Sequence, residues 1–327
     1  MYTIIHKPDA ESHELAKNVS AELKRLGIKN SISKDLYDES ELIIAVGDDK
    51  FILRAFRDIG KKQISLFAVS SGQSFLAQAN ALNFKHYLSL IKKNKYILFK
   101  RSRLVAKFDK STTPIALNDI GLFSSKSASL LKYSLILNNE LFWKETSDGL
   151  IISTPTGSTG YSLSAGGPII LDEPNIITLT SISSLEKHPS VIVSDGTKIR
   201  VDDIQGYKPV LVIDGESRIP VSTNEILIEK SPYSANFILF SKEYSLESRL
   251  KKRTLNVNID KLKGMPASSK LLYRILAEDG NMTQKELINA SMLPERTVRY
   301  ALNHLFKEGL ISYNPHLTDA RQIVYGV

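Results

Sequence analysis

The residues best suited to chemistry lie in one stretch, DGLIISTPTGSTGYSLSAGGPII, at positions 148–170. Asp148 supplies a carboxylate, and a run of seven small residues fills positions 153–159. Hydroxyl groups at this density donate and accept the hydrogen bonds that ribose and phosphate oxygens require. Small side chains also let a ligand approach the backbone closely. The stretch therefore predicts a nucleotide-binding loop; the alternative is a Ser/Thr-rich turn that bonds only to itself.

Elements on both sides must position this loop. The apolar residues 150–152 predict the end of a buried strand. Residues 160–165 predict a short helix, which the sequence Gly166-Gly167-Pro168 ends. A helix that starts behind a loop directs free N–H groups at it, and this arrangement suits an anion.

The whole stretch resembles the signature of the NAD kinase family, with Gly160 in place of the usual alanine. The resemblance implies that Asp148 binds the nicotinamide amide or ribose. Thr159 and Tyr161 would line the nicotinamide side, and Ser164 would face the adenosine side. The nucleotide contacts expected here are Asp148, Thr156, Thr159, Gly160, Tyr161 and Ser164.

A second motif, VGDDKFILRAFR, resembles the family's Gly-Gly-Asp-Gly-Thr loop. In an ungapped alignment Asp49 matches the family's general base on the ribose hydroxyl, and a shift of one residue would put Asp48 there. Gly47 keeps the first glycine, whereas Asp48, Lys50 and Phe51 replace its neighbours. Glycine loops let backbone N–H groups wrap phosphates. These changes predict a degenerate loop with weak or lost kinase activity, with Lys50 offsetting the charge of Asp48 or contacting a phosphate; the alternative is an acidic turn.

Three shorter motifs resemble other family elements, although each alone would predict only a turn. Gly72 lies in AVSSGQSFLA, which matches the end of a glycine-rich stretch. Asn118 and Asp119 match the Asn-Glu motif that contacts the nucleotide and its ribose hydroxyls. Asp214, in VIDGES, matches an Asp-Gly-Gln turn and would be a late acidic contact.

The pattern of elements predicts three folded parts. Strands expected at 3–5, 42–46 and 64–69 alternate with helices at 10–26 and 75–90, which is typical of a parallel sheet. We expect an α/β nucleotide-binding subdomain over 1–95 and a mostly β, dinucleotide-binding subdomain over 96–255, as in NAD kinases. A linker at 256–266 and a small α+β domain at 267–327 complete this division.

The last part resembles a winged helix-turn-helix domain. Thr283 and Glu286 predict a capping box, and Pro294 begins a third helix. Such domains place this helix in the major groove of DNA; the alternative is a protein contact. The expected DNA contacts are Arg296, Arg299, Tyr300, Asn303 and Lys307, with Arg321 in the wing.

The amino-acid composition excludes several classes of protein and of functional site. The chain has 327 residues, a formal net charge of +8 and no cysteine. The missing cysteines exclude disulfides, thiolate zinc sites and cysteine nucleophiles. No apolar run is long enough to span a bilayer, and the start lacks a secretion signal. These features predict a cytoplasmic protein without a membrane partner, and we expect no metal site in the chain.

Two functions compete. The altered loop and the fused module favour a DNA-binding transcription regulator whose body senses NAD, NADP or an adenine nucleotide. The alternative is an active NAD kinase that uses ATP or polyphosphate with Mg²⁺, with the last domain as a regulatory or assembly module. The resemblance also implies a homo-oligomer, either dimer or tetramer, and the first function requires double-stranded DNA as a partner.

Overall fold

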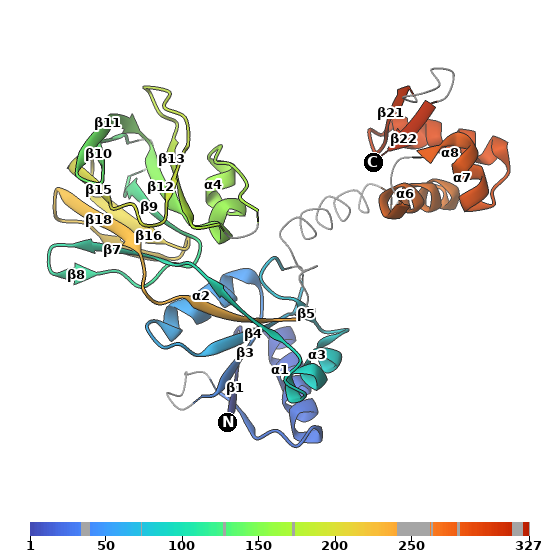
Figure 1. The fold of residues 1–327 in the computed structure, drawn as a ribbon, viewed down its shortest axis with the longest axis horizontal. Helices are drawn as coiled ribbons and strands as arrows, with labels where there is room; N and C mark the ends of the chain where they lie inside the picture. Colours follow the sequence, from blue (N-terminus) through green and yellow to red (C-terminus); the bar gives the residue numbers. More distant parts are fainter. Residues whose placement is uncertain are drawn as a thin grey trace. The chain divides into compact units, whose positions relative to one another are not determined.

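The computed structural model describes residues 1–33, 40–72, 74–126, 129–171, 174–240, 262, 264–279, 282–315 and 323–326. The chain forms two compact units, Met1–Leu246 and Glu247–Val327 (Figure 1). Among the described residues, no helix is both long and apolar enough to cross a membrane.

The first unit begins with a mainly parallel sheet of strand order β2-β1-β3-β4-β19-β6, with β5 beside β4. Strand β3 (Leu42–Val46) is buried along its whole length, because helices cover both faces of the sheet. Helices α1 (Ala10–Arg25) and α3 (Phe84–Lys92) contribute to one core cluster, and α2 (Asp49–Ile59) contributes to the other. The remaining strands of this sheet are β1 (Tyr2–His6), β2 (Asn30–Ile32), β4 (Ser65–Ser70), β5 (Ala79–Asn80), β6 (Ile97–Arg101) and β19 (Ala235–Leu239).

Two sequence-based expectations differ from this sheet. The helix expected at 75–90 is wrong in its first half: α3 begins only at Phe84, because the N–H groups of Phe75 and Leu76 donate to the Asp49 carboxylate. The sheet also extends beyond residues 1–95. Strand β19 returns late in the chain to pair with β4, and β6 pairs with β19 in the antiparallel sense.

Two antiparallel sheets follow, with strand orders β11-β10-β15-β18-β7-β8 and β14-β13-β12-β9-β16-β17. Their inner residues form one core cluster, so the sheets pack face to face. This observation confirms the expected β-rich part. The strands are β7 (Leu104–Phe108), β8 (Ser111–Thr112), β9 (Asp119–Ser124), β10 (Leu131–Leu137), β11 (Glu140–Ser147), β12 (Gly149–Ser153), β13 (Ile176–Ile182), β14 (Val191–Ser194), β15 (Ile199–Gln205), β16 (Pro209–Ile213), β17 (Ser217–Pro220) and β18 (Glu225–Lys230).

The described residues of the second unit form three helices and a small sheet of order β20-β22-β21. Thr283 and Glu286 form the expected capping box at the start of α7. Val298, Ala301, Leu302 and Leu305 form the buried side of α8, whereas Phe306, which has the same helical spacing, is 44% exposed. Arg321 and most of the expected linker lie outside the described residues. The elements are α6 (Ala267–Asp279), β20 (Met282–Thr283), α7 (Gln284–Ser291), α8 (Glu295–Lys307), β21 (Ser312–Pro315) and β22 (Ile323–Gly326).

Candidate functional site

The candidate site forms where the end of β12 meets the start of β9. The two strands are antiparallel, and Ser153 pairs with Asp119. Thr154 extends this contact, since its N–H donates to the Asn118 carbonyl at 2.9 Å and its hydroxyl donates to the Leu117 carbonyl at 2.6 Å. Strand pairing therefore brings together two motifs that are about 35 residues apart in the sequence.

The small residues of the loop are required by this close approach. A Cβ atom at Gly157 would overlap the Asn118 carbonyl. A Cβ atom at Gly160 would lie 3.6 Å from Asn118 Nδ2 and 3.7 Å from Asp119 Oδ2. Gly160 thus lies directly beside both side chains, between the short helices η1 (Thr156–Thr159) and α4 (Tyr161–Ser164).

The side chains of Asn118 and Asp119 both have polar atoms available for a ligand at this position. Asn118 Oδ1 is buried and has no hydrogen-bond partner among the described residues. The Asp119 side chain is buried, and this burial raises the pKa of its carboxyl to about 7, with a further contribution from the nearby charge of Asp214. A carboxyl with this pKa can accept or release a proton near neutral pH.

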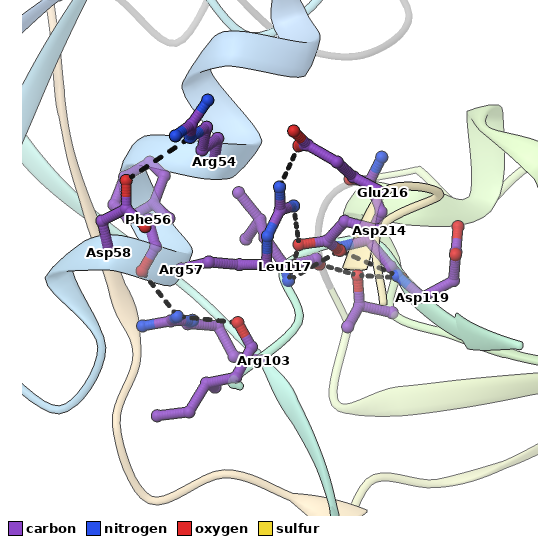
Figure 2. Close-up of polar contacts among 12 residues, drawn as sticks. Arg54, Phe56, Arg57, Asp58, Arg103, Leu117, Asp119, Asp214 and Glu216 are labelled. Carbon is purple, nitrogen blue, oxygen red and sulfur yellow. Dashed lines mark hydrogen bonds and ion pairs between the residues drawn. The ribbon is translucent and has the colours of Figure 1, made fainter. Parts of the chain in front are cut away.

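Asp214 lies in the turn between β16 and β17 and stabilises the same segment. Its carboxylate accepts N–H groups from Leu117 at 3.0 Å, Asn118 at 2.7 Å and Asp119 at 3.3 Å (Figure 2). Arg57 of α2 also donates to it, at 3.1 Å. The Asp214 side chain has no exposed surface. The structure therefore shows it holding the backbone, while the direct ligand contact that the resemblance implies for it stays a prediction.

The loop at the start of α2 has its own polar contacts. Asp48 caps the helix by accepting the Phe51 N–H at 2.9 Å, and it pairs with Lys7 Nζ at 3.0 Å. Lys7 therefore offsets the charge of Asp48, a role for which the sequence had suggested Lys50. Lys50 itself is exposed, and a Cβ atom at Gly47 would lie within 2.9 Å of the Phe51 ring.

Asp49 faces the segment that follows β4. Its carboxylate accepts the N–H groups of Phe75 at 2.8 Å and Leu76 at 3.0 Å, and the hydroxyl of Ser74. Gly72 lies in the exposed turn just before, where its N–H donates to Ser70 Oγ at 3.0 Å. Leu76 and Leu117 belong to one core cluster, so this loop and the Asn118–Asp119 turn pack on the same core.

Tyr161 offers an aromatic surface. Its ring stacks on Phe123 of β9 at 5.8 Å, with an interplanar angle of 15°, and its side chain is 49% exposed. The Phe123 ring occupies space that a side chain at Gly121 or Gly149 would fill. Sequence reasoning missed Phe123, although the glycines flanking it in the sheet could have indicated a large neighbour.

The other residues expected to contact the nucleotide are more widely spread around the Asn118–Asp119 turn. Arg101, which sequence reasoning also missed, donates to Thr156 Oγ1 at 3.4 Å. Thr159 is half-buried and Ser164 is exposed. Asp148 is exposed at the opposite end of β12, about 17 Å away along a strand that rises about 3.3 Å per residue. Within one chain the structure therefore does not bring Asp148 to the Asn118–Asp119 turn.

In the second unit, the residues expected to contact DNA share the solvent-facing side of α8. All five described members of the set are exposed. Arg299 pairs with Glu295 at 2.6 Å, and the Tyr300 ring stacks near His304 at 6.3 Å. The side of α8 is thus polar and accessible, as an interaction surface requires.

Comparisons with known proteins identify relatives of the first unit. Residues 117–240 match the ATP-NAD kinase C-terminal domain family. The NAD kinase of Flavobacterium psychrophilum is 34% identical over 230 residues, covering 67% of this chain and 78% of that protein. The NAD kinase of Bacteroides fragilis is 30% identical over 252 residues, covering 73% of this chain and 85% of that protein.

Solved structures agree with these relatives. The structure of an NAD kinase from Archaeoglobus fulgidus in complex with ATP has a TM-score of 0.67 and 26% identity, covering 76% of this chain and 98% of that one. Yeast NADH kinase complexed with NADH shares the fold, with a TM-score of 0.68 at 20% identity, covering 77% of this chain and 87% of that one. These findings support the enzyme over the regulator. They give no support to a degenerate loop, a winged helix or DNA binding. The chain belongs to the NAD kinase family.

Proposed function

We propose that the protein is an active NAD kinase, which transfers a phosphoryl group from ATP to a ribose hydroxyl of NAD and forms NADP. The observation that carries this proposal is the junction of the 154–160 loop with Asn118 and Asp119. It combines a buried carboxyl, whose pKa is raised to about 7 by burial, with a buried amide oxygen that has no partner in the described part of the chain, beside a loop that lacks bulky side chains.

Four side chains of the site have roles in this proposal. The Asp119 carboxylate accepts a hydrogen bond from a ribose hydroxyl, and Asn118 Oδ1 accepts one from a donor on the nucleotide. Tyr161 stacks on a planar ring of the dinucleotide through the face opposite Phe123. Asp49, by family resemblance, removes the proton from the attacking hydroxyl. ATP would bind as its magnesium complex, in which the metal would neutralise charge on the phosphates.

A direct assay tests the proposal. NAD and MgATP, or NAD and Mg-polyphosphate, are incubated with the purified full chain, and NADP is measured with an NADP-specific dehydrogenase. We expect turnover within the roughly 1–100 per second that kinases show. NADP formation no faster than in a reaction without the protein would refute this function. The DNA-binding regulator would then be the better explanation.

DNA binding by the second unit is a second candidate. It is favoured by the exposed polar side of α8 and by a helix and strand order, α6-β20-α7-α8-β21-β22, that is compatible with a winged helix. In this proposal the domain division at 256–266 separates a sensor from a reader. Fluorescence anisotropy with duplex DNA from the protein's own promoter region, with and without NAD, NADP and ATP, tests it. Absence of binding at low salt would leave α8 as a protein-contact surface.

Self-association is a third part of the proposal. Asp148 is remote from the Asn118–Asp119 turn of its own chain, so a second copy is needed to bring an Asp148 carboxylate to that turn. Light scattering at working concentration should therefore show a dimer or tetramer. A monomer that turns over at the full rate would remove Asp148 from the site.

A further inference from the structure

We propose that Arg57 is a positioning residue that sets the place of Asn118 and Asp119 relative to helix α2, and so the affinity for the dinucleotide. It acts through the Asp214 carboxylate and does not contact the nucleotide. This inference rests on the proposed function for its ligand, and on the structure alone for its geometry.

Asp214 holds the Asn118–Asp119 turn through hydrogen bonds. Three successive backbone N–H groups, at positions 117–119, converge on its carboxylate. The backbone N–H of Asp214 donates in return to the Asp119 carbonyl at 3.0 Å. Because side chains follow their backbone, a displacement of Asp214 would displace Asn118 Oδ1 and the Asp119 carboxyl together.

Arg57 in turn holds Asp214 through a hydrogen-bonded ion pair. The two terminal nitrogens of Arg57 contact different partners: Nη1 donates to Asp214 at 3.1 Å and Nη2 donates to Glu216 (Figure 2). The Arg57 side chain is only 5% exposed and the Asp214 side chain is fully buried, so water weakens the contact between them little. A planar fork that holds both carboxylates fixes the β16–β17 turn against α2, as a lysine could not.

A second arginine reinforces the same connection. Arg103 is fully buried and donates to the carbonyls of Phe56, Gly60 and Ile115, each at 2.8 Å. It therefore ties the last turn of α2 to the segment that leads into the Asn118–Asp119 turn. Arg103 thus joins α2 directly to the backbone before the turn, whereas Arg57 joins α2 to the turn through the Asp214 carboxylate.

Helix α2 connects the Arg57–Asp214 ion pair to the Asp49 carboxylate. Asp49 begins α2 and Arg57 lies eight residues later, about 12 Å along the axis at about 1.5 Å per residue. A helix of this length moves as a rigid body, so its start, with Asp49, and its end, with Arg57, move together. Arg57 consequently sets the separation between the Asp49 carboxylate and the acceptor turn.

The test compares two arginine variants in the full chain. Arg57→Met removes the fork. Arg54→Met is the matched control, since Arg54 lies one turn earlier on α2 and its ion pair with Asp58, at 3.8 Å, is exposed. Titration calorimetry measures NAD and ATP affinity separately, and hydrogen exchange measures protection of amides 117–119. For Arg57→Met we expect NAD affinity to fall about 2- to 30-fold, ATP affinity to change less than about twofold, and amides 117–119 to exchange faster.

A general loss of structure would weaken NAD and ATP alike, so an equal loss of both affinities would overturn the positioning role. Unchanged NAD affinity in a folded Arg57→Met would overturn it too. If Arg57→Met does not fold, Arg57→Lys is used: it keeps the charge and loses the fork, and unchanged NAD affinity and exchange would refute the inference. If the parent protein binds no NAD, the proposed function fails, and hydrogen exchange alone still decides whether Arg57 holds the turn.

Discussion

Replacing Asp119 by asparagine should stabilise the folded protein. Burial raises the pKa of Asp119 from 3.8 to about 7, which corresponds to about 4 kcal/mol at 1.36 kcal/mol per pH unit. Because the folded state holds this proton more tightly than the unfolded state, the carboxyl lowers the free energy of unfolding as pH rises from about 4 to about 7. Above that range the loss is complete and constant.

Urea unfolding of parent and Asp119→Asn, followed by fluorescence, measures this effect. The chain contains a single tryptophan, Trp143 in β11, so the signal reports only the first unit. We expect the variant to be more stable by about 4 kcal/mol near pH 8, with the advantage falling by about 2–3 kcal/mol near pH 5. Asp148→Asn, which replaces an exposed carboxyl, should differ from the parent by less than about 0.5 kcal/mol at both pH values. An advantage for Asp119→Asn that is absent, or equal at both pH values, would refute the argument that this buried carboxyl is strained by ionisation.

Three further outcomes are expected. Asp49→Asn should reduce NADP formation by about 10²–10⁴-fold if Asp49 is the general base, measured at saturating substrate; a full rate would exclude it. Tyr161→Ala should weaken NAD binding by about 0.5–1.5 kcal/mol, the worth of an aromatic pair, and calorimetry that shows no change would remove the ring from the site. Arg299→Ala should cost about 1–3 kcal/mol in DNA affinity if it reads a guanine, and should instead weaken all sequences alike and flatten the salt dependence if it holds a phosphate; anisotropy that detects neither makes the side of α8 a protein-contact surface.

The similarity to NAD kinases favours the kinase over the DNA-binding regulator. The substitutions at Asp48 and Lys50 had favoured loss of the kinase, on the argument that an added negative charge opposes ATP. In the structure Asp48 caps α2 and pairs with Lys7, so its charge has a cationic partner. The altered loop is therefore compatible with an active kinase, which the family relatives support.

Local patterns determined much of this protein. The apolar run at 42–46, the capping box at Thr283 and the small residues of 153–160 each predict their own element, because backbone sterics and short-range hydrogen bonds decide them. The match to the NAD kinase signature depends on consecutive residues and could likewise be found without a structure. Asp49, Asn118 and Asp119 were proposed as site residues in this way, and that assignment stays a prediction; their environments could not be predicted.

The tertiary structure alone decided what those side chains do. Asp49 accepts the N–H groups of Phe75 and Leu76, so the first half of the helix expected at 75–90 does not form, and no local propensity contains that contact between residues 26 positions apart. The raised pKa of Asp119 follows from burial beside Asp214, which lies 95 residues later and pairs with Arg57 from a third segment. Burial and long-range pairing depend on the whole chain packing at once, so the sequence could name the acids of the site but not which of them is strained and which is structural.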